Sequence, residues 1–469
     1  MANLNSFFQH KWETKKISDI FFFQEGPGVR KWQFRDKGIK LLNGRNINNS
    51  KLNLSNTSIY IDEEEANIKY QHFLVNEGDL VIASSGVVVN NFHNKIAFVK
   101  KEHLPLCMNT STIRFQTLDD KISSLAFLKF FLKTIFFKAQ MKRLITGSAQ
   151  LNFGPSHLHK IRIPLPSLNE QIRIATILSK AENLIAKRKE SIELLDELLK
   201  STFLEMFGFT NSKYKDWKTE PLLLNTDIVS GVTKGKKYND KNLIEAPYMR
   251  VANVQDGYFD LNEIKTIAVS QKEYEKHLLL KGDILLTEGG DPDKLGRGSV
   301  WENKIPNCIH QNHIFRVRIK SLLELNPYFL SALIGSMYGK KYFLKAAKQT
   351  TGIASINSTQ LKKFPLILPP VDLQNKFAQI VEKVDSIKSK YKQSLTELEN
   401  LYGTLSQRAF KGELDLSKIP IKQEPKPIAG TADITLPSME TEGAITDQKL
   451  FSNQELLKIK QQTRTLMMK

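Results

Sequence analysis

The chain has 469 residues, of which 41% are hydrophobic and 25% are charged. This composition is typical of globular domains, and it excludes a globally disordered chain, a collagen and a disulfide scaffold. Lys and Arg number 68 against 49 Asp and Glu, which gives a net charge of +19. A basic excess of this size favours a polyanionic partner, with nucleic acid first.

Cys107 and Cys308 are the only cysteines of the chain, and such sparse usage favours a reducing compartment. No cationic start leads into a long apolar run that would predict a secretory signal. The most apolar stretch, residues 125–137, is interrupted by Lys129 and Lys133 and is shorter than the roughly 18 residues of a membrane span. We therefore expect a soluble, cytoplasmic protein.

The first half of the chain predicts a mixed domain followed by a long helix. Residues 78–83 and 96–100 are strand-like runs bounded by Gly, Asn and Asp, and residues 125–143 have the pattern of a helix. Pro166 then precedes a heptad pattern of apolar residues that predicts a helix of about 37 residues, roughly 55 Å long.

The second half predicts the same order of elements. Residues 284–287 are strand-like, and a helix is expected over 328–347, with Asn326 as its cap and Pro327 at its first position. After Pro370 a second heptad pattern predicts a helix as long as the first.

The two halves form an internal repeat. Residues 165–171 match residues 368–374 at an offset of 203, and this register holds without a gap through both predicted long helices. Weaker matches precede each segment at offsets that drift between 201 and 207, as small loop insertions would produce. We expect an α+β fold of two mixed α/β domains separated by two long antiparallel coiled-coil helices, a pseudo-twofold repeat. The expected parts are a first mixed domain, a first helix, a second mixed domain, a second helix, and a linker with a tail, over residues 1–164, 165–210, 211–367, 368–416 and 417–469.

The heptad positions predict which side chains join the two helices. The alternative is that each helix packs on its own domain, but matched length and register favour pairing. The predicted pairing residues are Ile177, Leu184, Leu195, Leu198, Ile380, Ile387, Leu398 and Leu401.

Four motifs suggest chemistry, and each is better explained by structure. The segment 326–329 lacks the second proline of an amino-methyltransferase motif. Pro292-Asp293 with Glu302 and Lys304 matches a metal-dependent nuclease pattern only weakly. Residues 308–313 offer three zinc ligands where a structural site needs four, and residues 231–237 lack the spacing of a phosphate loop. We expect no catalytic residue and no metal site.

Polar, amide-rich loops on a basic background remain, and these suit DNA. Asn, Gln, Arg, Ser and Thr read bases in the major groove, while Lys and Arg hold phosphates. The alternative is ordinary variable surface loops. The candidate DNA-binding residues of the first half are Ser84, Ser85, Asn90, Asn91, His93, Lys95, Thr146, Ser148, Gln150 and Asn152. Those of the second half are Lys234, Lys236, Lys237, Arg250, Glu288, Asp291, Lys294, Arg297, His310, Gln311, Asn312, Thr351, Ser355 and Asn357.

The sequence resembles the DNA-specificity subunits of type I restriction-modification systems. The resemblance lies in Ile163-Pro164-Leu165-Pro166-Ser167-Leu168-Asn169-Glu170-Gln171 and its heptad helix, repeated from Leu368-Pro369-Pro370 to Gln374. It covers about residues 12–416. The second copy has Asp372-Leu373-Gln374 where Glu-Gln is usual, so that half matches less well.

The resemblance implies that each recognition domain reads one half of a bipartite, asymmetric site on double-stranded DNA. It further implies that the helix pair sets the unspecified spacer and docks modification subunits, usually two. Those subunits would carry S-adenosylmethionine and methylate adenine after flipping it out of the duplex. Restriction subunits that use ATP and Mg would join them, and this chain would bind no cofactor itself.

Two other classes of function are weighed against this one. One is a nuclease or methyltransferase with its own site, which cleavage or methyl transfer by the purified chain would establish. The other is a non-enzymatic nucleic-acid scaffold, which competition between duplex DNA and RNA would distinguish from a DNA-specificity subunit.

Phosphate contacts predict that the affinity of the chain for DNA falls steeply as the salt concentration rises.

Overall fold

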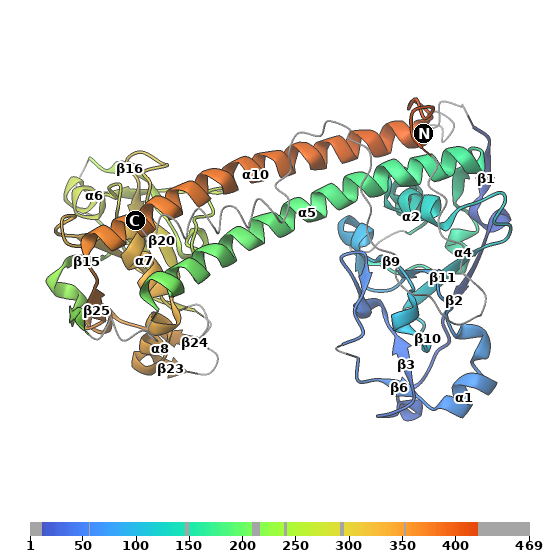
Figure 1. Cartoon of the computed structure of the whole chain (residues 1–469), viewed down its shortest axis with the longest axis horizontal. Helices are drawn as coiled ribbons and strands as arrows, with labels where there is room; N and C mark the ends of the chain where they lie inside the picture. The colour runs from blue at the N-terminus through green and yellow to red at the C-terminus, as the bar shows by residue number, and fades with distance from the viewer. Residues whose placement is uncertain are drawn as a thin grey trace. The chain divides into compact units, whose positions relative to one another are not determined.

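The computed structural model describes residues 12–55, 57–145, 150–208, 216–238, 242–290, 295–350 and 353–420. Its contacts divide the chain into two units. Unit 1 combines residues 1–189 with 393–442, and unit 2 contains residues 190–392 together with 443–469. Each unit is therefore built from one mixed domain and parts of both long helices (Figure 1). Of the predicted tail, residues 421–469 lie outside the described residues.

Unit 1 is built on an antiparallel sheet in the order β2-β11-β7-β9, beside a second sheet in the order β10-β3-β6. Its strands are β1 (Thr14–Lys16), β2 (Phe21–Glu25), β3 (Ile39–Leu42), β4 (Ile47–Asn48), β5 (Lys51–Leu52), β6 (Tyr60–Ile61), β7 (Leu80–Ala83), β8 (Val87–Val88), β9 (Ile96–Phe98), β10 (Leu106–Met108), β11 (Thr112–Thr117), β12 (Gln150–Leu151) and β13 (Arg162–Pro164). Its short helices are α1 (Glu63–Ile68), α2 (Leu125–Lys133), α3 (Ile135–Leu144) and α4 (Pro155–Leu158).

Unit 2 repeats this plan, with a sheet in the order β15-β22-β18-β20 and a second in the order β17-β16-β21. Its strands are β14 (Lys218–Pro221), β15 (Thr226–Ser230), β16 (Ile244–Met249), β17 (Lys265–Val269), β18 (Ile284–Thr287), β19 (Gly289–Gly290), β20 (Gly298–Val300), β21 (Ile309–His310), β22 (Ile314–Ile319), β23 (Lys348–Thr350), β24 (Ile353–Ser355) and β25 (Pro365–Leu368). Its short helices are α6 (Gln271–His277), α7 (Pro327–Gly335), α8 (Met337–Ala346) and α9 (Ser358–Lys362).

The two helical segments predicted at residues 125–143 and 328–347 are each divided in two. Thr134 ends α2 and begins α3, because its side chain accepts a hydrogen bond from the backbone N–H of Phe137. Ser336 does the same between α7 and α8, where it accepts from Gly339. A hydroxyl that caps a new helix competes with continuation of the old one. The expected cap at Asn326 is confirmed, since its side chain accepts from the backbone of Tyr328.

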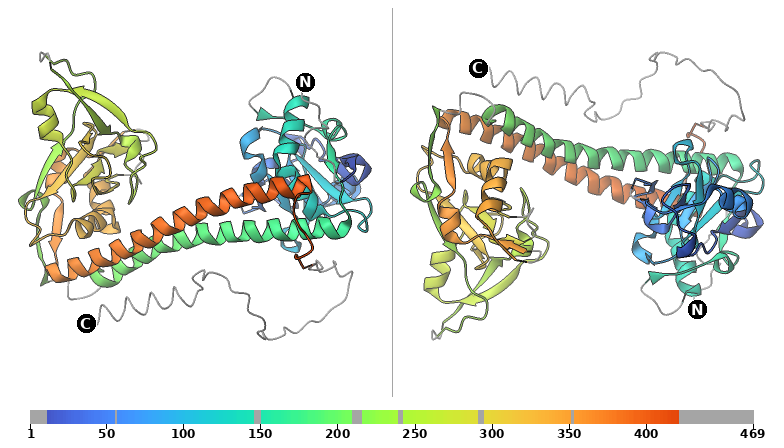
Figure 2. Two further views of the ribbon diagram at one scale, coloured as in Figure 1. Left: turned by 90° about the horizontal axis from the view of Figure 1, so that it is seen from above. Right: turned by 90° about the horizontal axis from the view of Figure 1, so that it is seen from below.

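The long helices are α5 (Leu168–Phe207) and α10 (Val371–Lys411), of 40 and 41 residues. At 1.5 Å per residue each is about 60 Å long. They run antiparallel within each unit, because in unit 1 Tyr402 contacts Glu182 while Glu399 contacts Lys189. The three views of Figures 1 and 2 agree that the two helices lie side by side.

In unit 2 the helix pair has its own small core of Leu195, Leu198, Ile380 and Val384, against which Ile387 packs. Four of these five are predicted pairing residues. In unit 1 Ile177 packs against the domain core instead. Both expectations for the helices therefore hold in part, since they contact each other and also their domains.

The structure contradicts the prediction that Leu401 is a pairing residue, because its side chain is 51% exposed. The neighbouring Tyr402 packs against the unit 1 core in its place. A straight α-helix drifts by about 20° per heptad from a strict seven-residue repeat, so the contact stripe has moved by one residue at this end of α10. Leu184 and Leu398 are half-buried.

A charged junction fixes α2 to the long helices in unit 1. Glu182 of α5 pairs with Lys129 at 3.0 Å and Lys133 at 2.7 Å, and it accepts a hydrogen bond from the hydroxyl of Tyr402 at 3.1 Å. Burial alone would raise the pKa of Glu182, but the two ammonium groups outweigh it, so the pKa is lowered. The carboxylate thus joins three helices as an anion.

The glutamine shared by both copies of the repeat motif is a buried anchor. Gln171 donates to the carbonyls of Pro166 and Ile122 and accepts from the backbone N–H of Ser124. Gln374 makes the matching three bonds with the backbones of Pro369, Glu324 and Asn326. Both side chains are fully buried, so α5 is tied to the loop that precedes α2, and α10 to the loop that precedes α7.

The missing glutamate of the second copy is also explained. Glu170 closes a capping box, since its carboxylate accepts from the backbone N–H and the hydroxyl of Ser167. Such a cap stabilises a helix by about 1 kcal/mol. The second copy lacks the box and keeps the glutamine anchor.

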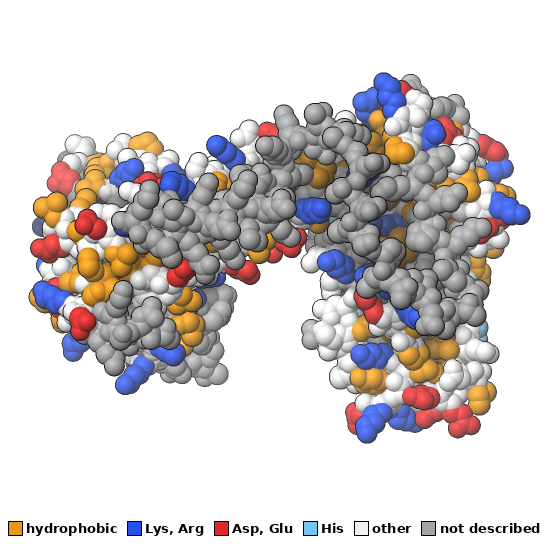
Figure 3. Space-filling model, viewed as in Figure 1, with side chains coloured by type: hydrophobic (Ala, Val, Ile, Leu, Met, Phe, Trp, Pro, Cys, Tyr) orange, Lys and Arg blue, Asp and Glu red, His pale blue; other side chains and the backbone are white. Residues whose placement is uncertain are grey.

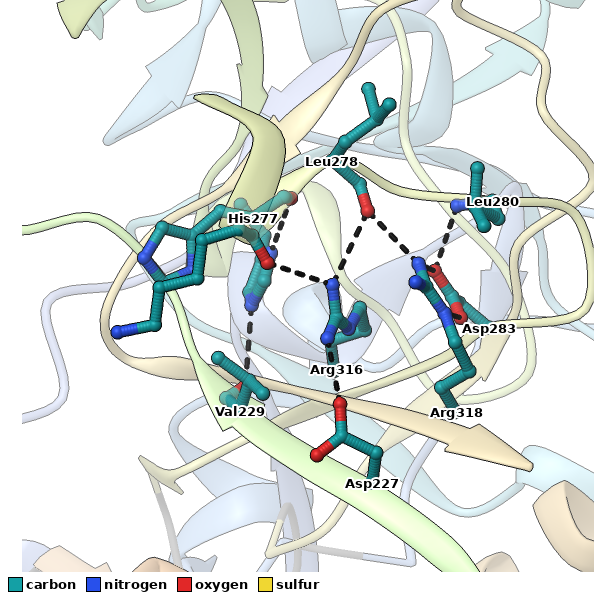
Figure 4. Close-up of polar contacts among 10 residues, drawn as sticks. Asp227, Val229, His277, Leu278, Leu280, Asp283, Arg316 and Arg318 are labelled. Atoms are coloured by element: carbon teal, nitrogen blue, oxygen red, sulfur yellow. Dashed lines mark hydrogen bonds and ion pairs between the residues drawn. The ribbon is translucent and has the colours of Figure 1, made fainter. Parts of the chain in front are cut away.

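An arginine in the central strand of each main sheet holds the loop that leads into the neighbouring strand. In unit 2, Arg316 donates to the carbonyls of Lys276 and Leu278 and to the carboxylate of Asp227 (Figure 4). In unit 1, Arg114 occupies the matching register position and donates to the carbonyls of Leu74 and His72. The repeat is therefore preserved in buried polar contacts as well as in strand order.

Candidate nucleic-acid interface

Three loops and one strand end of unit 1 meet around a polar hollow. They are the end of β2, the loop after β7, the loop before β11 and the loop after β12, and α4 adds His157. The lining residues are Glu25, Ser84, Ser85, Thr110, Ser111, Asn152, Phe153, Gly154 and His157. The structure thus brings together Ser84, Ser85 and Asn152, which were predicted from two loops far apart in the sequence.

Asn152 organises the rim of this hollow. Its side-chain oxygen accepts hydrogen bonds from the hydroxyl of Ser85 at 3.0 Å and from the backbone N–H of Gly86 at 2.8 Å. Ser85 and Asn152 are exposed, so their remaining hydrogen-bonding capacity faces outward.

Ser84 has a different role from the one predicted. Its side chain is only 1% exposed, and its backbone joins the three loops, because its N–H donates to Ser111 and its carbonyl accepts from Phe153. It therefore positions the rim and presents no side chain to a ligand.

Glu25 is a lining residue that the sequence analysis missed. It ends β2, and burial raises the pKa of its carboxyl group. The next residue is Gly26, where a Cβ atom would lie 2.4 Å from the carbonyl oxygen of Asn109, so only glycine fits there. Within the described ranges, the Glu25 carboxylate has no hydrogen-bond or ion-pair partner. The only sequence signal for it is an acidic residue beside a glycine at a strand end, which is too common to be diagnostic.

Unit 2 assembles a matching group of loops. The backbone N–H of Ile356 donates to the Glu288 carbonyl, as that of Phe153 donates to Ser84. The backbone N–H of Asn357 donates to the side-chain oxygen of Gln360, as the backbone N–H of Gly154 donates to Nδ1 of His157. These bonds place Glu288, Asn312, Ser355 and Asn357, all predicted, at the positions of Ser84, Thr110, Asn152 and Gly154.

The chemistry at the two matched places differs. Ser230 occupies the position in unit 2 that Glu25 occupies in unit 1. The carboxylate of the unit 2 loops is instead Glu288, at the position of Ser84, and its oxygen lies 2.8 Å from Nδ1 of His313. Each unit therefore combines a carboxylate with an imidazole, but on different elements of one scaffold. Asn357 is also the cap of α9 and accepts from the backbone of Gln360.

The other predicted residues of unit 1 do not line the hollow. Lys95 donates to the side chain of Asn48 at 2.6 Å, and burial lowers the pKa of this lysine. Asn91 is exposed and His93 is half-buried. Asn90 and Gln150 lie in described backbone, whereas Thr146 and Ser148 lie outside the described residues.

Among the basic candidates of unit 2, Lys234 and Lys237 are exposed. Lys236 forms an ion pair with Glu273 at 2.6 Å, and Arg250 is paired with Glu263 at 3.1 Å. Both are therefore partly neutralised. Of the remaining candidates, the half-buried ones are Arg297, Gln311, Asn312 and Ser355, and those outside the described residues are Asp291, Lys294 and Thr351.

His310 is wrong as a DNA-binding residue. Its side chain is fully buried, with one ring nitrogen 3.2 Å from the carbonyl oxygen of His277 and the other 3.3 Å from that of Val229. Burial lowers the pKa of His310 to about 3. The ring is a neutral core group that no base can reach.

The charged side chains are interspersed on the described part of the surface shown in Figure 3. Lys and Arg lie among Asp and Glu on both units, and no single basic patch dominates that face. A distribution of this kind suits several local phosphate contacts better than one continuous basic groove.

The motifs considered for other chemistry have structural roles. Cys107 and Cys308 are buried free thiols, and burial raises the pKa of each to about 12. The two cysteines are offset by one position, because Leu106 and Cys308 make the matching backbone bonds to Val75 and Leu279. In the part of the chain that the structure describes, no three His, Cys, Asp or Glu residues converge as metal ligands.

Glu302 of the weak nuclease pattern accepts a hydrogen bond from the Tyr328 hydroxyl and pairs with Lys281 at 3.4 Å. Asp293, the other acidic residue of that pattern, lies outside the described residues. None of the described helices has the length and hydrophobicity needed to cross a bilayer.

Comparison with known proteins agrees with this duplicated architecture. Residues 9–194 and 223–400 each match the family model described as the type I restriction modification DNA specificity domain. The chain is 23% identical over 432 residues to the EcoKI specificity subunit of Escherichia coli strain K12, covering 86% of this chain and 89% of that protein. It is also 23% identical over 428 residues to the StySPI specificity subunit of Salmonella potsdam, with the same coverage.

Among solved structures, one reported for the assembly and conformational transition of a type I restriction-modification system has the same fold. It is 17% identical, has a TM-score of 0.51, and covers 87% of this chain and 99% of that one. Since the family model matches more than half of the residues, once in each copy of the repeat, the chain belongs to the family of type I restriction-modification DNA specificity subunits.

Proposed function

We propose that this chain recognises a bipartite, asymmetric DNA sequence, with one half-site read by each unit. The observation that carries the proposal is the pair of matched loop groups, around Glu25 and Ser85 in unit 1 and around Glu288 and His313 in unit 2. Two copies of one scaffold with different polar side chains at the same place fit two unlike half-sites.

Type I specificity subunits are non-catalytic and work with DNA and with modification and restriction subunits. We expect two modification subunits for this chain, because the repeat supplies two similar surfaces for them. S-adenosylmethionine would be bound by the modification subunits, and ATP and Mg by the restriction subunits. The proposed contribution of this chain is to choose the sequence and to hold the partners on it.

A map of methylated adenines tests the proposal. The chain is co-expressed with the modification subunits of its own system in a host without DNA methylation, and modified adenines are located by long-read sequencing. We expect one motif with two unlike halves and a fixed gap. A stable complex that produces no such motif, or preferred binding of RNA over duplex DNA in competition, would contradict the proposal.

The length of the helix pair should set that gap. Inserting seven residues after Ile192 in α5 and seven after Lys392 in α10 lengthens both helices by about 10 Å and nearly preserves their phase. We expect the unspecified gap to lengthen by about three base pairs, since DNA rises about 3.4 Å per pair, with both half-site sequences unchanged. The same insertion in α5 alone is the control, and it should break the pairing and give no new motif. An unchanged gap in the variant with both insertions would show that the length of the helix pair does not set the gap.

A further inference from the structure

The hollow of unit 1 contains a carboxylate that is free to bind. Ser85 and Asn152 on its rim are bonded to each other, while Glu25 has no hydrogen-bond or ion-pair partner among the described residues. The carboxylate in the loop group of unit 2 is different, because Glu288 is held by His313 at 2.8 Å. The two units therefore present one unengaged and one engaged carboxylate, at different positions of the shared scaffold.

The hollow also contains a hydrogen-bond donor. Nδ1 of His157 accepts from the backbone N–H of Gly154 at 3.3 Å, so Nε2 is the ring nitrogen that can donate. Both Glu25 and His157 line the hollow. A strong acceptor beside a donor distinguishes bases by the groups on their major-groove edges. Guanine offers acceptors there and thymine an acceptor and a methyl group, whereas cytosine and adenine each carry an exocyclic amino group.

We propose that Glu25 is a specificity-determining residue that accepts a hydrogen bond from the exocyclic amino group of a cytosine or an adenine in the half-site read by unit 1. A partly desolvated carboxylate repels the acceptor edges of guanine and thymine, so it selects against them as well as for an amino group. This inference rests on the proposed function and identifies the class of base that the hollow of unit 1 takes.

The test uses the full chain in complex with its modification subunits. Affinity is measured for duplexes that carry each of the four bases at each position of the unit 1 half-site. The wild-type complex should prefer cytosine or adenine by at least about tenfold at one position, and the preferred base there distinguishes the two sources of the amino group. In Glu25→Gln that preference should fall at least about fivefold, because an amide can also donate to guanine or thymine. The unit 2 half-site and the gap should not change.

Two further variants keep the result interpretable. Glu288→Gln is the matched control and should leave the unit 1 half-site unchanged. Glu25→Asp retains the charge with a shorter side chain. It is measured in place of Glu25→Gln if Glu25→Gln melts at a lower temperature than the wild type. A wild-type preference for guanine or thymine at every position of the unit 1 half-site, or an unaltered preference in a stable Glu25 variant, would overturn the inference. A wild-type complex without any bipartite motif would instead contradict the proposed function.

Discussion

Replacing Phe410 with alanine should destabilise unit 1 by about 3–5 kcal/mol, although α10 joins that core more than 200 positions after Leu178, the last core residue from the first half of the chain. Phe410 is 1% exposed, and its ring centroid lies 5.0 Å from that of Phe127 and 5.9 Å from that of Phe131. Both partners belong to α2. Truncating the ring leaves a cavity between α10 and α2 that the surrounding helices can close only in part.

Hydrogen exchange is the suitable measurement, because it follows the two units separately where a single melting curve would mix them. Amides of β7 and β11 should exchange much faster in Phe410→Ala, and those of β18 and β22 should not. Leu401→Ala is the matched control on the same helix, with a side chain that is 51% exposed, and it should change the free energy of unfolding by about 0.5 kcal/mol at most. Equal protection of β7 in the two variants would show that α10 does not complete the core of unit 1.

Acidification from pH 7 to pH 5 should lower the free energy of unfolding of unit 2 by about 2 kcal/mol through His310 alone. Burial lowers the pKa of His310 to about 3 in the folded chain, against about 6.5 when it is unfolded. The unfolded chain therefore binds a proton that the folded chain rejects. The stability is fully present above pH 6.5 and is lost as the pH falls from 6.5 toward 3. His277 adds to the loss, since burial lowers its pKa as well.

The repeat supplies the variant that tests this. Met108 holds the register position in unit 1 that His310 holds in unit 2, so His310→Met places an untitratable side chain on a scaffold that already accepts it. Hydrogen exchange of β18 amides at pH 7 and pH 5 should show a much smaller loss of stability in the variant. Carboxyl groups titrate mainly below this window, which isolates the histidines. An identical pH dependence in both proteins would place the acid sensitivity elsewhere.

The parts of the fold that follow from local patterns were predictable. The heptad positions at Leu195, Leu198 and Ile380 and the cap at Asn326 depend on spacing within one element, which the sequence displays directly. The split at Thr134 was missed because a hydroxyl in an apolar run can point to solvent or cap a new helix with the same sequence. The exposure of Leu401 was missed because a small drift of helical phase accumulates over the three heptads from Ile380 to Leu401.

The candidate site was only partly predictable, for reasons of topology. Ser85 and Asn152 lie in polar loops that the composition makes visible. Glu25 becomes a neighbour of both only because β2 and β7 each pair with β11, and this strand order is not written in any local pattern. His310 shows the opposite failure, because a polar side chain in a short polar run proved to be a core residue of β21.

The order in which the chain is made differs from the order in which its units are completed. The described residues of unit 2 come from one continuous stretch, but unit 1 also needs residues 393–411 of α10. At about 5–20 residues per second, the ribosome takes roughly 10–40 s to reach that segment after finishing the first domain. During this time the α2 surface that Phe410 later covers is open to water and to other nascent chains. The domain synthesised first is thus the last to be closed, and its exposure during translation is a cost of building one unit from both ends of the repeat.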